Sequence, residues 1–413
     1  MYYQDIFLKA RQASRSFKNY AKIDDFLNFL ANRIEMNSEK LLVANRNDLD
    51  RMSATDLKYD RLKLTARSIS DIAADMRYVS TLPSPLGVVL EQWVCPNELN
   101  TSKISVPIGV VGVIYEARIN VTFKMFSLCI KSGNACVLKS GNNVECSNKE
   151  AVSIIQEALK QFNIDSAMIS LLPPEEEAAK KMLTANEYVD VIISHGSKEL
   201  IDFVRRNAKI PVIETGSGIV HIYYDKTALR EMALSIINNS KTRRINVCNS
   251  LDCLIVHKNR LNDLSIVFNP LADSRVIIYA DEHAMRALRG RYPVDLLKKA
   301  DENSYTTDYL DYRMAVKTVD NIEEALDHIA QYSSRHSEAI ISNDPENIEL
   351  FLNSVDAAVV YVNASTAFTD GAQFGLGAEI GVNAQKLHAR GPMGLNELTT
   401  YKWIVRGKGQ IRE

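Results

Sequence analysis

Apolar side chains recur at helical spacing through the opening part of the chain, from Tyr2 to about Tyr78. They return every three or four positions, as at Ile23, Phe26, Leu27, Leu30 and Ile34, and mostly charged or amide residues lie between them. Such a stripe covers one side of a helix and leaves the other side polar. The pattern predicts a group of amphipathic helices that pack through their apolar faces.

Turn-forming residues at 81–87 (TLPSPLG) end the helical pattern. Apolar and polar positions then alternate in two runs, 88–94 and 101–106, with Pro96 and Asn97 between them. Alternation of period two on both sides of a turn is typical of a β-hairpin. We expect this hairpin to form an exposed arm.

From Gly109 onward, short apolar runs alternate with helical segments. Strands are predicted at 110–115, 135–139, 168–172, 189–193 and 212–214, and helices near 122–131, 147–162, 175–186 and 198–207. A second series follows Cys248, with strands near 251–257, 276–279, 339–342 and 357–362. Strands that alternate with helices form parallel sheets covered on both faces. The sequence therefore predicts an α/β fold with two such domains.

Composition narrows the class of function. The 413 residues suffice for two or three domains. Lys and Arg number 49 and Asp and Glu 51, a net charge of −2, so no global basic field favours nucleic acid or an anionic membrane. We find no apolar run of membrane-spanning length and no leader-like start, and the six cysteines have no disulfide framework spacing. We expect a cytoplasmic protein without disulfides.

The glycine-rich segment 375–381 (GLGAEIG) imitates a dinucleotide-binding fingerprint. Its last gap is one residue too long, and too little chain follows for the βαβ unit that the fingerprint needs. We expect a tight loop near a ligand instead, because glycine permits close backbone approach. A Walker-type Gly-Lys-Ser/Thr loop is absent from the sequence, so ATP chemistry has no support.

Cys248 is the cysteine best suited to chemistry. It stands in the polar segment 241–250 (KTRRINVCNS), where neighbouring arginines can lower the pKa of the thiol. A structural thiol is the alternative, because cysteine is usually a core residue. A metal site with Cys253 and His257 is disfavoured, because the spacing matches no common zinc pattern and 254–256 is typical of a buried strand. We therefore expect no metal.

Other polar residues near these segments suit anionic ligands. Asn246 and Asn249 flank the thiol, where they either donate hydrogen bonds to an oxyanion or form a turn. The segment 385–394 (QKLHARGPMG) places Lys386, His388 and Arg390 in a glycine-containing loop. Such a loop suits a phosphate or carboxylate, or else is a solvated surface loop.

Several segments together resemble one enzyme family. They are 106–122 (VPIGVVGVIYEARINVT), 131–135 (KSGNA), 247–249 (VCN), 368–381 (FTDGAQFGLGAEIG) and 401–403 (YKW). Nearly end to end, the chain resembles the gamma-glutamyl phosphate reductases, or glutamate-5-semialdehyde dehydrogenases, of the aldehyde dehydrogenase superfamily. The resemblance implies that Cys248 is a nucleophile rather than a structural thiol.

Carried over by position, the resemblance implies further roles. The side chain of Asn120 and the backbone N–H of Cys248 would form an oxyanion hole. Lys139 would contact the adenosine ribose of the cofactor. Gly196 and Ser197 would meet its pyrophosphate at the start of a helix.

The remaining expected ligands lie in other segments. Asp308 matches the position of the acid that holds the nicotinamide ribose. We expect Arg118, together with Lys386, His388 and Arg390, to bind the phosphate and the α-carboxylate of the substrate. No assignment of one anion to one residue follows from the sequence.

The implied fold is two doubly wound α/β domains with a small β oligomerisation arm. We expect an NADP-binding domain at 1–238 that carries the hairpin near 88–106, a catalytic domain at 239–365, and a return segment at 366–413. The C-terminal strand of that segment would join the hairpin in an arm that pairs with a neighbouring subunit. A homodimer or higher homo-oligomer is expected, and glutamate 5-kinase is the candidate protein partner.

The implied reaction is the NADPH-dependent reduction of L-glutamyl 5-phosphate to L-glutamate 5-semialdehyde and phosphate through a thioester, the second step of proline biosynthesis. NADPH is favoured because 140–143 (SGNN), which follows Lys139, has no carboxylate to repel a 2′-phosphate. Two alternatives stay open: an aldehyde dehydrogenase that oxidises a free aldehyde, and an inactive scaffold of the same fold.

A few residues depart from the family pattern or bear on these alternatives. Ile119 and Ile245 stand where prolines are usual, and His195 precedes a Gly-Ser pair where the family usually has Arg-Gly-Gly. Glu214 matches the segment whose glutamate activates water in superfamily members that hydrolyse the thioester. We expect it instead to be a strand-end carboxylate bonded to backbone N–H groups.

Overall fold

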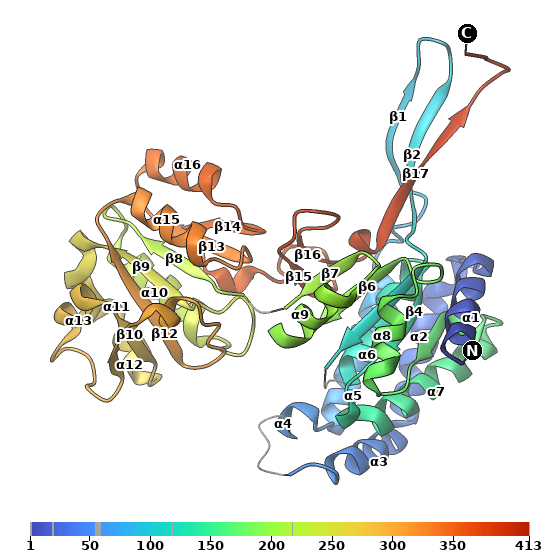
Figure 1. Ribbon diagram of the computed structural model, residues 1–413, viewed down its shortest axis with the longest axis horizontal. Coiled ribbons are helices and arrows are strands. Elements are labelled where there is room, and N and C mark those ends of the chain that lie inside the picture. Colours follow the sequence, from blue (N-terminus) through green and yellow to red (C-terminus); the bar gives the residue numbers. More distant parts are fainter. Residues whose placement is uncertain (1, 19, 54–58, 117–118, 217, 413) are drawn as a thin grey trace. The chain divides into compact units, whose positions relative to one another are not determined.

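The computed structural model describes residues 2–18, 20–53, 59–116, 119–216 and 218–412 (Figure 1). The chain forms two compact units. The first contains 1–215, 375–381 and 393–413, and the second contains 216–374 and 382–392. The division falls after Thr215 rather than near residue 239, because the next strand, β8 (His221–Tyr224), pairs with two strands of the second unit.

The first unit is built on parallel strands in the order β7-β6-β3-β4-β5. They span Val212–Thr215, Val191–His195, Val110–Tyr115, Ala135–Lys139 and Ile169–Leu171. The middle strand, β3, is buried at every position, which accounts for its unbroken apolar sequence. The connecting helices are α6 (Ile119–Lys131), α7 (Glu145–Gln161), α8 (Glu176–Leu183) and α9 (Lys198–Asn207).

The predicted amphipathic helices precede this sheet. They are α1 (Tyr2–Ser16), α2 (Ile23–Met36), α3 (Ser38–Leu49), α4 (Tyr59–Leu62) and α5 (Ala66–Thr81). The stripe predicted on α2 is buried along its length, and Phe26 packs edge-on against Phe126 of α6. A capping box between Thr65 and Ser68 starts α5 by satisfying backbone N–H groups that the first turn leaves open.

Three antiparallel strands form the predicted arm. The hairpin strands β1 (Val89–Val94) and β2 (Asn100–Pro107) pair with each other, and β17 (Thr399–Arg406) pairs along the other edge of β2. In Figure 1 the three strands extend together beyond the helices of the first unit. The two tryptophans of the arm, Trp93 and Trp403, pack edge-to-face and remain 43% and 47% exposed.

The second unit contains a seven-stranded parallel sheet in the order β11-β10-β12-β9-β8-β13-β14. Its strands other than β8 span Leu297–Lys299, Ile277–Ala280, Arg313–Val319, Cys253–His257, Ser337–Ile341 and Val359–Val362. Its helices are α10 (Arg230–Thr242), α11 (Leu264–Val267), α12 (Asn269–Asp273), α13 (Glu282–Leu288), α14 (Glu302–Tyr305), α15 (Ile322–Tyr332) and α16 (Pro345–Ser354). Two separate apolar clusters, one with side chains of α10 to α13 and one with α15 and α16, cover the two faces of the sheet.

The segment that imitates a dinucleotide fingerprint is a loop. Residues 375–381 form neither helix nor strand, and Gly375 and Gly377 have φ values of 74° and 79°. A Cβ atom at Gly377 would come within 2.6 Å of the Leu82 side chain, so glycine is required there. The loop is followed by the short hairpin β15 (Val382–Asn383) and β16 (Gly391–Pro392). No helix in the described ranges has the length and apolar character that a membrane span requires.

Candidate active site

Cys248 lies in a loop between α10 and β9, and its side chain is half-buried. Hydrogen bonds join the two ends of this loop. Lys241, fully buried in the last turn of α10, donates a hydrogen bond to the carbonyl of Leu251 at 2.9 Å, and the Leu251 N–H donates to Ser240. The Ser250 N–H closes a turn onto Val247. These bonds hold the thiol in a short, constrained turn.

Asn249 has a structural role in this turn. Its buried side-chain amide donates to the carbonyls of Thr369 at 3.0 Å and Ala367 at 3.4 Å, and its own carbonyl accepts from Thr366. The amide is therefore occupied in anchoring the 366–369 segment, which favours the turn interpretation over an oxyanion donor. Asn246 is exposed.

A buried charged group lies beneath the thiol loop. Asp252, next to the loop, accepts hydrogen bonds from the N–H groups of Val220 and Tyr309. Burial raises the pKa of Asp252 to about 7 and that of Asp308 to about 6, and the Lys241 ammonium opposes both shifts. Burial also lowers the pKa of Lys241 to about 8. Asp308 Oδ2 is buried and has no hydrogen-bond partner in the described part of the chain.

The predicted cationic loop converges on one carboxylate that the sequence did not reveal. Asp356 accepts from Arg390 at 2.8 Å and Lys386 at 3.0 Å, and Arg335 lies 3.8 Å away. These hydrogen bonds lower the pKa of Asp356. Arg390 keeps two further donors, Nε and Nη2, that are buried and unpartnered within the described ranges. His388 lies in the same loop, with a left-handed φ of 65°.

In the first unit, the sheet brings the expected cofactor residues to one edge. Lys139 ends β4, and Gly196 and Ser197 follow β6, two strands whose carboxyl ends share an edge with β3. Burial lowers the pKa of Lys139, while Glu175 and Glu176 oppose that shift. Carboxylates therefore do lie near this lysine, supplied by a segment distant in sequence.

The N-terminus of α9 is hydrogen-bonded to the carboxylate of Glu116, a side chain of the same unit. Ser197 is the N-cap, and its hydroxyl and backbone N–H donate to the Glu116 carboxylate at 2.7 and 3.3 Å. A Cβ atom at Gly196 would meet Leu200 and Glu116 within about 3.1 Å. Donors that hold a carboxylate at a helix N-terminus also suit a pyrophosphate, so these residues fit the expected cofactor once Glu116 moves away.

Two expected residues stand at the start of α6. Asn120 is exposed in the first turn of that helix. Arg118 lies outside the described residues. Asn120, Lys139, Gly196 and Ser197 belong to the first unit, whereas Cys248, Asp308 and the cationic loop belong to the second.

Glu214, near the end of β7, is held by a guanidinium group. Arg205 of α9 donates to both carboxylate oxygens, from Nε at 2.7 Å and from Nη2. The backbone N–H partners expected for this carboxylate stay a prediction, and the bidentate arginine is a partner that the sequence did not reveal. Both oxygens of this carboxylate are therefore engaged by the guanidinium group.

Comparison with known proteins places these features in a class. The sequence profile of the aldehyde dehydrogenase family matches residues 10–272. That range includes the sheet of the first unit, the α9 N-terminus and the Cys248 loop. The chain is thus an aldehyde dehydrogenase-type oxidoreductase in fold and family.

The particular family follows from nearly full-length relatives. A gamma-glutamyl phosphate reductase of Chlorobium limicola is 56% identical over 411 residues, covering 99% of this chain and 98% of the relative. One from Bacteroides fragilis is 55% identical over 392 residues, with 95% and 94% covered. The crystal structure of gamma-glutamyl phosphate reductase from Thermotoga maritima, 36% identical, matches with a TM-score of 0.95 over both whole chains. The chain belongs to the gamma-glutamyl phosphate reductase family.

These findings confirm the predicted family, fold class and enzyme class. The roles expected for individual residues stay predictions. Sequence reasoning missed Asp356, Glu116 and Lys241, because each acts through a partner that only the fold brings near it.

Proposed function

We propose that this chain reduces L-glutamyl 5-phosphate to L-glutamate 5-semialdehyde with release of phosphate, the second step of proline biosynthesis. The observation that carries this proposal is the name shared by relatives above 50% identity over nearly the whole chain. The constrained turn that presents Cys248 supports it, since a reductase that starts from an acyl phosphate needs a positioned nucleophile.

In the proposed mechanism, the Cys248 thiolate attacks the acyl carbon, the carbon–oxygen bond to phosphate breaks, and a thioester forms. Asn120 and the backbone N–H of Cys248 stabilise the oxyanion of each tetrahedral species. Lys139, Gly196 and Ser197 would hold NADPH, which would supply the hydride that reduces the thioester carbonyl. The carbon–sulfur bond then breaks, which frees the aldehyde and restores the thiolate.

We assign the cofactor site to Lys139, Gly196, Ser197 and Asp308. The α9 N-terminus takes the pyrophosphate, and Lys139 takes the adenosine ribose with its 2′-phosphate. The local sequence after Lys139 favours NADPH over NADH. Glu175 and Glu176 also attract the Lys139 ammonium. The preference for NADPH over NADH therefore depends on whether the 2′-phosphate interacts with this ammonium more strongly than the two carboxylates do.

We assign substrate binding to the cationic loop and to Arg118. Arg390 is the strongest candidate, because its two unpartnered donors form the fork that matches a carboxylate or phosphate. Lys386 supports the loop through Asp356, and His388 is the third candidate ligand in the same loop. The Glu214–Arg205 pair accords with a reductase that does not hydrolyse its own thioester.

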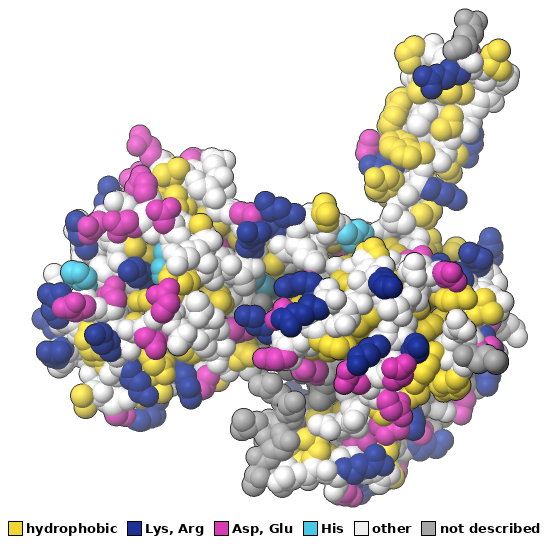
Figure 2. Space-filling model, in the orientation of Figure 1, with side chains coloured by type: hydrophobic (Ala, Val, Ile, Leu, Met, Phe, Trp, Pro, Cys, Tyr) yellow, Lys and Arg dark blue, Asp and Glu magenta, His cyan; other side chains and the backbone are white. Residues whose placement is uncertain are grey.

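We also propose that the arm joins subunits into a homodimer or a larger homo-oligomer, with glutamate 5-kinase as the partner that delivers the unstable acyl phosphate. Figure 2 shows hydrophobic side chains over much of the arm, and Val94, Tyr401 and Val405 are all more than half exposed. A cytoplasmic location is supported by the absence of disulfides among the described residues.

The decisive experiment is reduction of NADP⁺ by the purified chain with glutamate 5-semialdehyde, with and without phosphate. Strict dependence on phosphate is the expected result. Equal rates without phosphate would identify an oxidiser of free aldehydes. A folded chain that gives no turnover in either condition would identify an inactive scaffold.

A further inference from the structure

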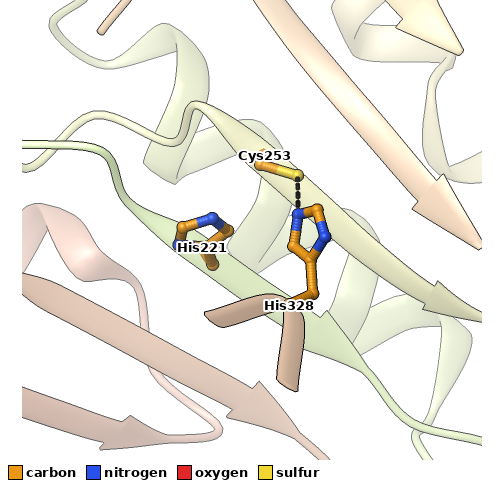
Figure 3. Close-up of side chains that lie close together, drawn as sticks. All are labelled: His221, Cys253 and His328. Atoms are coloured by element: carbon orange, nitrogen blue, oxygen red, sulfur yellow. Dashed lines mark hydrogen bonds between the residues drawn. The ribbon is translucent and has the colours of Figure 1, made fainter. Parts of the chain in front are cut away.

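A group of metal-binding side chains lies in the core of the second unit, and the proposed reaction does not use it. His221 and Cys253 are direct cross-strand neighbours on β8 and β9, and His328 comes from α15, which covers that face of the sheet. Figure 3 shows the three side chains lying close together. They are 0%, 1% and 6% exposed.

We propose that His221, Cys253 and His328 bind a zinc ion that ties β8, β9 and α15 together. The sequence analysis disfavoured a metal site of Cys253 with Cys248 and His257 and did not consider this one, because the two histidines are far from Cys253 along the chain. Parallel pairing brings one of them beside the thiol, and the covering helix brings the other.

The spacing of the ligand atoms suits one ion. One ligand atom from each residue lies within 4.8 Å of the other two, and Cys253 Sγ is 3.6 Å from His328 Nε2. Bonds of about 2.3 Å to sulfur and 2.1 Å to nitrogen separate tetrahedral ligands by about 3.4–3.6 Å. The Cys253–His328 pair already has this separation, and the His221 atom, within 4.8 Å of both, would have to move by at most about 1.4 Å.

His221 is arranged as metal-ligating histidines usually are. Its Nδ1 lies 3.1 Å from the carboxylate of Glu338, which is itself fully buried. The other ring nitrogen, Nε2, is buried and has no hydrogen-bond partner among the residues described. A ligating histidine typically donates its second N–H to a carboxylate, which fixes the ring and frees the other nitrogen for the metal. An ion at this place would satisfy a nitrogen whose isolation otherwise destabilises the fold.

The donor set favours zinc. Two imidazoles and a thiolate suit zinc better than the hard cations, which prefer oxygen ligands. Three protein ligands leave the fourth tetrahedral position to a water molecule. A divalent ion, the Cys253 thiolate and the Glu338 carboxylate together carry no net charge, which a buried position requires. Cys253 begins the strand that follows the Cys248 loop. The ion would thus fix the end of that loop without taking part in the reaction.

The test is cobalt substitution in the full-length chain, stripped of metal and titrated with Co²⁺ alone. We expect one ion per chain and a thiolate-to-cobalt charge-transfer band in the near ultraviolet. The band should persist in Cys248→Ala, which removes the half-buried thiol proposed to be the nucleophile, and in Cys136→Ala, which removes a buried strand cysteine of the first unit. It should vanish in Cys253→Ala, and Glu338→Gln should weaken binding about 10- to 100-fold.

A folded wild-type chain without the band would overturn the proposal. So would a band that disappears with Cys248→Ala and survives Cys253→Ala, since the ion would then sit on the reactive thiol. If Cys253→Ala does not fold, His328→Gln carries the same expectation. Zinc should also raise the thermal midpoint of the stripped wild-type chain and of Cys136→Ala, and an unchanged midpoint in both would count against a structural ion.

Discussion

The carboxylate of Asp356 determines which cation of the 385–394 loop is left for a substrate. It takes one guanidinium nitrogen of Arg390 and the ammonium of Lys386. A lysine held in this way is a poor second ligand, whereas Arg390 still has two donors to offer. The ion pair therefore orients the arginine without consuming its fork.

We expect Arg390→Ala to raise the KM for semialdehyde or phosphate about 10- to 100-fold, the range for losing a charge-assisted hydrogen bond. The value of kcat should change less. Steady-state kinetics in the phosphate-dependent assay measure both. Arg335→Ala is the matched control, because Arg335 contacts the same carboxylate at 3.8 Å and is not assigned to the substrate. Unchanged KM values in Arg390→Ala would show that the loop serves structure alone.

Cys248→Ala should reduce phosphate-dependent turnover to a trace, because only the thiolate can form the thioester. Circular dichroism and NADPH binding should stay as in the wild type. Cys129→Ala, a change at a buried cysteine of α6, should act on stability and leave kcat nearly intact. More than trace activity in Cys248→Ala would refute the covalent mechanism.

Asp308 gives the second unit a defined pH response. Its pKa is raised from 3.8 to about 6, chiefly by burial, so the folded chain binds this proton more tightly than the unfolded chain does. The stabilisation from this group is complete below about pH 4 and is lost as the pH rises through 6. In Asp308→Asn, the free energy of unfolding should decline less over that window than in the wild type, as urea denaturation would measure. Parallel curves for the two chains would mean that the carboxyl group titrates normally.

At the scale of elements, a carboxylate of the chain occupies the N-terminus of α9, where the cofactor pyrophosphate is proposed to bind. The Glu116 carboxylate takes the N–H and hydroxyl of Ser197, which the pyrophosphate would also use. Both are anions attracted to the same helix end. Binding of the cofactor therefore includes displacement of a side chain.

Glu116→Gln should tighten NADPH binding about two- to fivefold, because it removes a negative charge whose interaction with a helix terminus is worth up to about 1 kcal/mol at exposed sites. Fluorescence titration of NADPH into the purified chain measures the change. Glu199→Gln, an exposed acid in the first turn of the same helix, is the control and should have a smaller effect. Weaker binding in Glu116→Gln would mean that the carboxylate supports the bound state.

Element prediction from the sequence succeeded where burial follows residue type. Strand β3 is apolar throughout and was predicted at its observed bounds. Strand β8 was missed because it begins with a histidine that reads as polar, although that position is fully buried against Glu338. Strand β12 was missed because Arg313 and Lys317 interrupt its apolar run. For His221 the compensating partner, Glu338, comes from a segment distant in sequence, whereas Arg313 pairs with Asp311 two residues away.

The candidate site shows the same division. Cys248 could be singled out because its neighbours along the chain are polar. Two other contacts could not be predicted from a local sequence pattern, because each joins segments far apart in the chain. They are the hydrogen bond from Asn249 to Thr369 and the hydrogen bonds from Ser197 to Glu116. The Asn249 contact changes a residue considered for catalysis into one that positions the loop.

At the scale of the molecule, the arm is the surface that a second subunit would cover. Trp403→Glu places a charge beside Trp93 in the centre of its apolar side chains and should shift the chain toward the monomer, as sedimentation velocity would measure. The cross-strand neighbour of Trp403, Lys103, is already paired with Glu91, so the added carboxylate would bring an excess charge into the interface, which is strongly unfavourable when buried. Val294→Glu alters a side chain that is 90% exposed in the second unit and should leave the assembly unchanged. An oligomer that survives Trp403→Glu would place the interface elsewhere.

The pairing of β2 with β17 has a consequence for how the protein is made. The ribosome produces β1 and β2 early, then all of residues 216–374, and only afterwards the segment that forms β17. Until then one edge of β2 has no neighbouring strand, and an open edge invites pairing with other chains. Chains truncated before Thr399 should therefore aggregate more readily than the full chain, although their two α/β units are nearly complete. Once β17 has paired with β2, the open edges of the described three-stranded sheet are those of β1 and β17, the edges through which a second subunit would pair.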